Sequence, residues 1–402
     1  TDKWTFVLKL PAPSLALVRS NLMERLDEYI YPRETVEKWG DLNRWDRVIG
    51  TGPFMMKDYV PGSAITVVRN PNYWQHDTHY PQNQLPYVDE VKALIISDTS
   101  TALAAMRTGK LDRLESLDWE SALHLRQTNP EIIVYTDTRS GTSPAIAMQL
   151  DRPPFNDIKV RRAMQMAIDL KTLAATYYGG YPDGLPPGSA RVLAYNSKYA
   201  DWPQEVKDGY AYNPKGAKQL LAEAGYPNGF KTTLDLPLSA DLDLMAILKA
   251  YWADIGVDVG LNVMEIGAYS NYAYVAGKVQ GMSLSRFGAN VGGGPQAPFK
   301  RYSRNRTDVY KQHNNNDPYF EGLIAKAINS VDEDEEMRLT READLYGTTQ
   351  HWQVVTQMVP SSTAVQPWVK RFLPVQPGGS GLEGHMASWI WIDQDLKKLM
   401  GH

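Results

Sequence analysis

The chain has 402 residues, 43% of them hydrophobic and 22% charged, and at about two to three times the roughly 100–200 residues of a usual domain it is expected to form two lobes. Its 42 Lys and Arg against 46 Asp and Glu give a formal net charge of −4, which provides no general field to attract nucleic acid or an anionic membrane. It contains no cysteine, which excludes disulfides, thiol nucleophiles and thiolate metal sites. No apolar stretch approaches the roughly 18 residues that a membrane helix needs.

The first elements predicted along the chain are strands. Residues 3–10 form a predicted strand that prolines end. A strand so close to the start needs a pairing partner, which indicates either that preceding sequence is missing or that later strands pair with it. Further on, the apolar runs 54–56 and 64–69 are separated by the turn residues Pro61 and Gly62, which predicts a β-hairpin.

A strand and a helix follow the hairpin. Residues 91–96 form a predicted strand, and Asp98 is placed to cap a helix over 100–108 that stops at Gly109. Two more strands are predicted near 132–135 and at 145–148.

Two amphipathic helices come next. One begins at Lys159, and the other begins at Pro214 with Asn213 as its N-cap and Gly225 as its stop. The residues expected on their buried faces are Val160, Ala163, Met164, Ala167 and Ile168 in the first, and Ala217, Leu220, Leu221 and Ala224 in the second.

A strand–helix–strand unit is then predicted. It consists of the strand 231–236, a helix over 244–255 that Gly256 ends, and the strand 257–263. Such units in succession argue for an α/β sheet covered by helices in the second half of the chain.

Beyond this unit, residues 286–306 show no hydrophobic period and are rich in Gly, Pro and Asn, which predicts a long loop. A loop of that length is usually functional or disordered. The remaining predicted elements are helices near 319–331 and 333–346, a strand near 354–358, and a last strand at 388–392 after a glycine-rich stretch.

Several blocks, in a fixed order, carry a resemblance to a known family. They are GTGPF at 50–54, RNPNYW at 69–74, TALAAMRTGKLD at 101–112, PFNDIKVRRA at 154–163 with AID at 167–169, and YNPKGAKQLLAEAG at 212–225. The chain resembles the family 5 extracellular solute-binding proteins of ABC importers, the group that includes oligopeptide-, dipeptide-, nickel- and oligosaccharide-binding members. The likeness covers nearly the whole chain.

The resemblance implies an α/β, two-lobed periplasmic-binding-protein-like fold of type II and the large cluster C kind, with hinge strands between the lobes. On this plan residues 1–142 are the remainder of lobe 1, whose N-terminal part is missing from this sequence. Residues 143–380 form lobe 2, and residues 381–402 return to lobe 1. The missing part would include backbone that often lines the ligand cleft.

The function implied is that of a receptor and not of an enzyme. It would capture a small polar solute, an oligosaccharide or a peptide, between two lobes and deliver it to the permease of an ABC importer. The resemblance implies a monomer without cofactor or nucleic-acid partner, in the periplasm or otherwise outside the cytoplasm, with a lipid anchor on the full-length form as an option. Two alternatives stay open: a truncated fragment with no competent cleft, and a glycoside hydrolase that uses carboxylates such as Asp151 and Glu265.

The loop at 286–306 is where the resemblance places a ligand anchor. In peptide-binding relatives, an acidic residue after a Trp-Gly turn holds the α-amine of the ligand. Here Phe287 stands at the tryptophan position and Gly294 near the position of the acid. An ammonium buried without a charged or polar partner is costly, so ordinary peptides are disfavoured. A sugar or another neutral polar solute fits the 23 Tyr and 11 Trp of the chain.

Six residues are the candidate ligand contacts: Trp119, Arg286, Phe287, Asn290, Trp389 and Trp391. For each aromatic residue, core packing is the alternative. Trp389 and Trp391 are two positions apart and are therefore expected to share a strand face. A buried Arg286 would imply a carboxylate or phosphate on the solute, and the alternative is a rim arginine in water.

The run His76-Asp77-Thr78-His79 gathers residue types that bind metals. No further ligand lies nearby in the sequence, so no metal site is predicted there. The other histidines are dispersed, with no nucleophile or general-base spacing around them.

Overall fold

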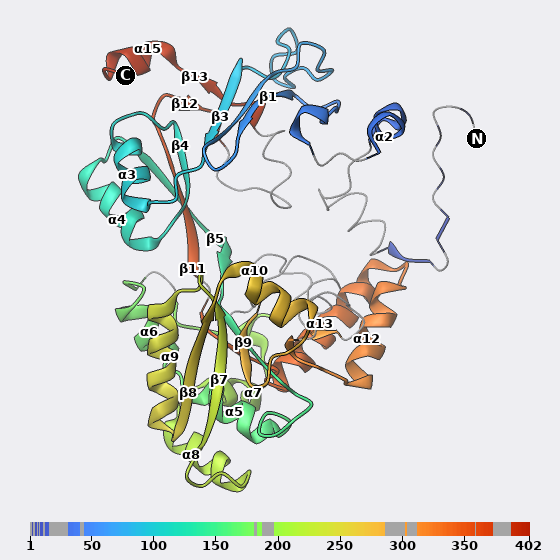
Figure 1. Cartoon of the computed structure of the whole chain (residues 1–402), viewed down its shortest axis with the longest axis vertical. Helices are drawn as coiled ribbons and strands as arrows, with labels where there is room; N and C mark the ends of the chain where they lie inside the picture. Colours follow the sequence, from blue (N-terminus) through green and yellow to red (C-terminus); the bar gives the residue numbers. More distant parts are fainter. Residues whose placement is uncertain are drawn as a thin grey trace. The chain divides into compact units, whose positions relative to one another are not determined.

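The computed structural model describes residues 31–40, 44–180, 183–186, 197–285, 302–303, 312–357, 359–372 and 387–402, with single positions before residue 16; for 137–142 and 360 it describes the backbone alone. The chain forms two compact units. The first unit is Thr1–Ser20 with Thr138–Pro360, and the second unit is Asn21–Asp137 with Ser361–His402. Figure 1 shows the elements of each unit.

Two strands carry the chain from one unit to the other. β5 (Ile133–Thr142) contains the change at 137–138 and β11 (Val359–Val365) contains the change at 360–361, while the earlier change at 20–21 lies outside the described residues. Both belong to one sheet in the order β4 (Arg113–Leu117), β11, β5. The compact units change at 360, within β11, a strand that was not predicted from the sequence, and the lobe boundary at 380 stays a prediction.

The first unit is built on a mixed sheet of five strands. Their order is β10 (Gln353–Val355), β6 (Ala145–Met148), β9 (Met282–Leu284), β7 (Phe230–Pro237) and β8 (Val257–Met264). β7 is parallel to both β8 and β9, while β6 is antiparallel to β9 and β10. α9 (Leu242–Asp254) connects β7 to β8 and runs along β8 (Figure 1). The predicted α/β class is therefore confirmed.

Side-chain caps and apolar stripes fix the helices of the first unit. Asn213 accepts a hydrogen bond from the Gly216 N–H and starts α8 (Pro214–Glu223), as predicted. The predicted face of α5 (Ile158–Met166) is fully buried. The other helices are α6 (Leu170–Thr176), α7 (Gln204–Tyr210), the short α10 (Ile266–Tyr269) with a π-helical turn after it, α12 (Pro318–Ile328) and α13 (Glu333–Thr349).

An aromatic cluster anchors α12 and α13, which lie side by side (Figure 1). Phe320 meets Trp352 edge to face at 5.1 Å and Tyr302 at 6.0 Å between ring centroids. Tyr302 and Trp352 are also edge to face, at 5.2 Å. Because edge-to-face pairs add to the gain from apolar burial, the cluster holds the helix pair to the turn before β10.

The second unit contains a three-stranded antiparallel sheet and several helices. β1 (Phe54–Val60) and β2 (Ala64–Arg69) form the predicted hairpin, and β3 (Glu90–Leu94) pairs with β2. Asp98 caps α3 (Thr99–Arg107), as predicted. The remaining elements are α2 (Arg33–Trp39), α4 (Trp119–Thr128), β12 (Val369–Lys370), β13 (Trp391–Ile392) and α15 (Gln394–Leu399).

Several predicted bounds differ from the structure. Of the strand predicted near 354–358, only Val354 and Val355 are described as extended, at the end of β10, and β11 begins beyond it at Val359. The strand predicted at 388–392 is extended only at its last two residues, because Ser388 and Trp389 lie in a turn. The predicted strand at 3–10 and the predicted loop at 286–306 lie largely outside the described residues.

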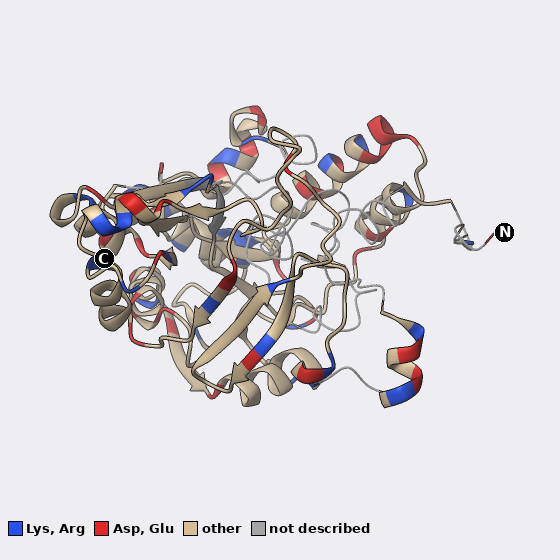
Figure 2. Cartoon of the chain, turned by 90° about the horizontal axis from the view of Figure 1, so that it is seen from above, with Lys and Arg blue, Asp and Glu red and all other residues tan. Residues whose placement is uncertain are grey.

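None of the helices in the described ranges is long and apolar enough to cross a membrane. Figure 2 shows basic and acidic residues interspersed through the described chain. That distribution agrees with a net charge of only −4.

The close approach of Gly229 and Gly256 at the amino ends of β7 and β8 gives a test of the parallel pairing. A Cβ on Gly229 (φ +74°) would lie 1.8 Å from the Gly256 oxygen, whereas a Cβ on Gly225 (φ +91°) meets nothing within 4 Å. We expect Gly229→Ala to lower the free energy of unfolding by about 3 kcal/mol or more, since it adds a backbone clash to left-handed strain. Gly225→Ala incurs the strain alone, about 1 kcal/mol. Urea unfolding followed by circular dichroism measures both, and equal losses would contradict the close approach.

Candidate functional site

The carboxyl ends of β7 and β8 meet at one edge of the sheet in the first unit. The two strands stay in register from Phe230 and Val257 to Pro237 and Met264. Just beyond them, the Leu238 N–H donates to the Met264 carbonyl at 2.7 Å. In α/β sheets, ligands bind outside the carboxyl ends of parallel strands, especially where neighbouring connections diverge. This edge is therefore the candidate site that the fold provides.

Four aliphatic side chains are exposed at this edge. They are Leu238 (64% exposed), Ile266 (53%), Val263 (40%) and Leu242 (37%), here called the edge patch. Each lies within a few residues of the end of β7 or β8. Adjacent exposed aliphatic residues on a soluble domain commonly mark a contact surface for a ligand or partner.

Glu265 adds a negative charge beside the edge patch. Its Oε2 accepts a hydrogen bond from the Ala268 N–H at 2.9 Å and so caps α10. Hydrogen bonds from the N–H groups of Gly267 and Ala268 lower the pKa of Glu265, so this exposed carboxyl is ionised at neutral pH.

A polar row lies one layer below the edge, in which Asp235 and Ser283 are buried and Asn262 is exposed. Asp235 of β7 faces Asn262 of β8 and Ser283 of β9, and Asn262 Nδ2 donates to Asp235 Oδ1 at 2.8 Å. Burial raises the pKa of Asp235. Gln312 Nε2 donates to Ser283 Oγ at 3.1 Å and to the Leu284 carbonyl at 2.9 Å, which ties the segment at 312 to β9.

Buried amides continue this row toward β6 and β10. Gln149 Nε2 donates to the Gln312 carbonyl at 2.7 Å, and Asn314 Nδ2 donates to Gln149 Oε1 at the same distance. Gln353 Nε2 lies 3.0 Å from His313 Nε2. Burial lowers the pKa of His313 to about 4, so its imidazole is neutral at pH 7. Residues 312–315 are thus held on the sheet by hydrogen bonds.

The structure describes three of the six predicted ligand contacts, all in the second unit. Trp119 is the first residue of α4 and is half-buried. Trp391, 39% exposed, pairs with Lys370 in β13, while Trp389 lies in the preceding turn beneath the guanidinium of Arg371. The expectation that Trp389 and Trp391 share a strand face is wrong, because the strand begins only at Trp391.

The other predicted contacts, Arg286, Phe287 and Asn290, lie outside the described residues. Among the described three, no ring contact joins Trp119 to Trp389 or Trp391. The role of all six as ligand contacts stays a prediction.

The edge patch and the polar row were missed by the sequence analysis. One local signal was present, since Asp235 interrupts an otherwise apolar strand end between Leu234 and Leu236. A charged residue at a buried strand position is uncommon and usually has a specific partner. Asn262, the partner of Asp235, and Gln312, which donates to Ser283, are distant in sequence and gave no such signal.

The run from His76 to His79 is organised around Asp77. The buried Asp77 carboxylate forms an ion pair with Arg371 and accepts hydrogen bonds from Tyr87 Oη (2.5 Å) and the His79 N–H (2.7 Å). Burial raises the pKa of Asp77, but the hydrogen bonds from Arg371 and Tyr87 outweigh it, and the pKa lies well below its usual range. Among the described residues, no cluster of three His, Asp or Glu side chains could hold a metal ion.

The two carboxylates considered for glycoside hydrolysis are both engaged elsewhere. Asp151 pairs with Arg152 at 3.0 Å, which lowers its pKa, and the pKa of Glu265 is lowered by the helix it caps. A glycosidase acid needs a raised pKa to stay protonated, so neither group is suited to that role.

Comparison with known proteins identifies relatives of the chain. The sequence profile described as "Bacterial extracellular solute-binding proteins, family 5 Middle" matches residues 1–309. Heme-binding protein A of Haemophilus influenzae is 29% identical over 311 residues, which are 74% of this chain and 52% of that protein. Glutathione-binding protein GsiB of Salmonella typhimurium is 28% identical over 286 residues, 69% of this chain and 51% of that protein. The chain thus spans about half the length of the curated relatives it matches.

Solved structures share the fold. The periplasmic binding protein AgaA of A. tumefaciens R10, in complex with agropinic acid, superposes with a TM-score of 0.76 at 22% identity, over 96% of this chain and 75% of that one. The periplasmic binding protein DppA of Helicobacter pylori, in complex with the peptide STSA, gives 0.68 at 24% identity, over 86% and 63%.

The Asp77–Arg371 pair gives a test in the second unit. We expect Asp77→Asn to lower the melting temperature by roughly 5–10 °C, because it leaves a partly buried guanidinium without its carboxylate. Asp89 is a matched control, since it pairs with Arg69 while its own side chain is 93% exposed. Asp89→Asn should change the melting temperature by about 1 °C or less. Similar shifts for the two variants would contradict a structural role for Asp77.

The buried His313 predicts a pH dependence of stability. Its pKa is about 4 in the folded chain against the usual 6.5, so the unfolded chain takes up the proton first. The folding stability that comes from burying a neutral imidazole is present in full above pH 6.5. It is lost as the pH falls from 6.5 to about 4. We expect His313→Gln to reduce the loss of unfolding free energy between pH 7 and pH 4 by about 3 kcal/mol. His79→Gln, at an exposed position, should leave that loss unchanged. Urea titrations across this pH range measure it, and parallel pH curves for wild type and His313→Gln would rule the effect out.

Proposed function

Because the chain belongs to family 5 of the bacterial extracellular solute-binding proteins, we propose that it is a receptor that captures a small solute outside the cytoplasm and delivers it to an ABC importer. The family match over residues 1–309 carries this proposal. The receptor acts as a monomer, releases its solute unchanged, and uses neither a cofactor nor a nucleic acid.

Binding without catalysis is favoured over hydrolysis. The lowered pKa values of Asp151 and Glu265 suit ion pairing and helix capping rather than proton donation to a leaving group. A fragment without a competent site would bind none of the solutes tested.

Of the two solute classes expected from the sequence, the edge patch supports a peptide-like solute over an oligosaccharide. Its exposed side chains are aliphatic, and the neighbouring Glu265 is ionised. Aliphatic groups pack against apolar side chains of a peptide, and a carboxylate pairs with an amine, whereas a sugar needs hydroxyl partners and aromatic faces. Two relatives have ligands of this kind, the peptide STSA and glutathione.

A solute panel tests the proposal. Melting temperatures are measured with tetrapeptides that carry apolar side chains, with glutathione and with malto- and cello-oligosaccharides, and solutes that raise the melting temperature are examined by small-angle scattering. We expect at least one peptide to raise the melting temperature and to reduce the radius of gyration, because a receptor of this family closes its lobes on the solute. Stabilisation without compaction for every solute would contradict the receptor mechanism.

Variants at the edge patch test the solute class separately. Leu238→Asp and Ile266→Asp should each weaken peptide binding at least 10-fold, because each removes apolar contact and adds a charge beside Glu265. Val331→Asp is the matched control, since Val331 is also exposed in the first unit but lies between α12 and α13. Unchanged affinity in both patch variants would show that the solute does not bind at the edge patch. Binding of oligosaccharides alone would contradict a peptide-like solute.

A further inference from the structure

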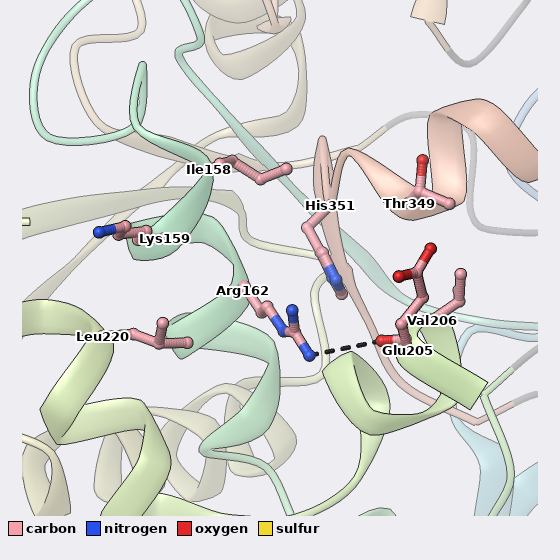
Figure 3. Close-up of a pocket in the computed structure, with 8 residues that line it drawn as sticks. All are labelled: Ile158, Lys159, Arg162, Glu205, Val206, Leu220, Thr349 and His351. Atoms are coloured by element: carbon pink, nitrogen blue, oxygen red, sulfur yellow. Dashed lines mark hydrogen bonds between the residues drawn. The ribbon is translucent and has the colours of Figure 1, made fainter. Parts of the chain in front are cut away.

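A pocket of about 350 Å³ lies in the first unit where four segments meet (Figure 3). Its lining residues are Ile158, Lys159 and Arg162 of α5, Glu205 and Val206 of α7, Leu220 of α8, Thr349 at the end of α13, and His351 in the turn that follows. α8 leads toward the amino end of β7, whereas the edge patch follows the carboxyl ends, and Figure 1 shows α8 and α10 at opposite ends of the sheet. The pocket is therefore separate from the candidate solute site, and its volume is sufficient for a small organic ligand.

Arg162 has unused hydrogen-bonding capacity in this pocket. Its Nη2 donates to the Glu205 carbonyl at 3.3 Å, while its buried Nε has no acceptor in the part of the chain that the structure describes. The adjacent Arg161 differs, because its guanidinium donates three hydrogen bonds to backbone carbonyls. A half-buried guanidinium with one long hydrogen bond is suited to a planar anion that can accept two parallel N–H groups.

His351 presents a second donor. Its side chain is almost fully buried, its ring stacks on Tyr210 at 4.7 Å, and its Nδ1 has no hydrogen-bond partner among the described residues. Burial and the charges of Arg162 and Arg161 lower the pKa of His351 to about 3, so the imidazole is neutral at pH 7 and carries one N–H. Figure 3 shows the imidazole directed toward the Arg162 guanidinium.

Both side chains pack closely against the buried Gly209 of α7. A Cβ added to Gly209 would lie 2.6 Å from His351 Nε2 and 3.3 Å from Arg162 Nε. The two nitrogens therefore lie near each other on Gly209, in an arrangement that a side chain at residue 209 would prevent.

Within the described ranges, no carboxylate forms an ion pair with Arg162, and the other charges near the pocket are directed elsewhere. Lys159 Nζ pairs with Glu223 at 3.1 Å. Figure 3 shows the Glu205 carboxylate turned away from the guanidinium, to which Glu205 offers its backbone oxygen. Ile158, Val206 and Leu220 form the apolar part of the wall.

We propose that this pocket binds a small carboxylate with a short aliphatic body. The carboxylate accepts hydrogen bonds from the Arg162 guanidinium and the His351 imidazole, and the aliphatic body packs on Ile158, Val206 and Leu220. Inorganic phosphate would leave the apolar wall without a partner, and a neutral amide would leave the guanidinium without an anion.

Calorimetric titration at pH 7 tests the site with 4-methylpentanoate, 4-methylpentanamide and inorganic phosphate. We expect the carboxylate to bind at least 10-fold more tightly than the amide or phosphate. Arg162→Gln should weaken carboxylate binding at least 10-fold, and Arg162→Lys, which keeps the charge without the planar fork, about fivefold. Arg338→Gln is the matched control, because Arg338 is an exposed arginine of α13 that pairs with Glu335 and Glu342.

Gly209→Ala provides an independent variant that retains both donors. Its methyl group would lie 2.6 Å from His351 Nε2 and 3.3 Å from Arg162 Nε, so it displaces the donors from their positions, and carboxylate binding should fall at least 10-fold. Circular dichroism and melting temperature establish that each variant is folded before titration. Equal binding of carboxylate and amide, unchanged binding in folded Arg162→Gln, or an equal loss in Arg338→Gln would each overturn the proposal.

Discussion

The parallel pairing of β7 with β8 is the constraint on which the candidate solute site depends. The two strands share one register over their whole length, so their carboxyl ends emerge side by side. That register is possible because Gly229 and Gly256 approach so closely at the amino ends that a side chain on Gly229 would collide with backbone. A slip of one residue would exchange the two faces of β7 and move Asp235 away from Asn262.

Polar hydrogen bonds, more than apolar contacts, hold the irregular segments of both units. In the first unit, the amides of Gln149, Gln312 and Asn314 attach residues 312–315 to the sheet. In the second unit, Asp77 holds its own loop and joins it to Arg371. Buried hydrogen bonds require specific partners at specific distances, so they fix a loop in one conformation where apolar packing would tolerate several. A binding protein whose loops are held in this way presents a preorganised surface to its ligand.

Local signals in the sequence predicted much of the fold. Asn213 with Pro214, and Asp98 with Gly109, bracket helices because capping is decided by neighbouring residues. β9 was not predicted because a strand of three residues is too short to show a hydrophobic period. β11 was not predicted because it follows β10 so closely that the sequence pattern does not separate the two strands. The candidate sites were harder to predict from the sequence than the fold. Arg162 and His351 are far apart in sequence, and only the packing of α5 and α7 against the turn before β10 makes them neighbours.

The order of the units along the chain has a consequence for biosynthesis. The first unit draws nearly all its elements from the continuous stretch 138–360, while the second unit needs both the residues before 138 and those after 360. During translation, the inserted stretch can therefore complete its sheet while the earlier segment still lacks β11 as the neighbour of β4. Until the ribosome has delivered the residues after 360, Arg371 among them, Asp77 remains without its counter-ion, and the nascent second unit stays incomplete for longer than the first.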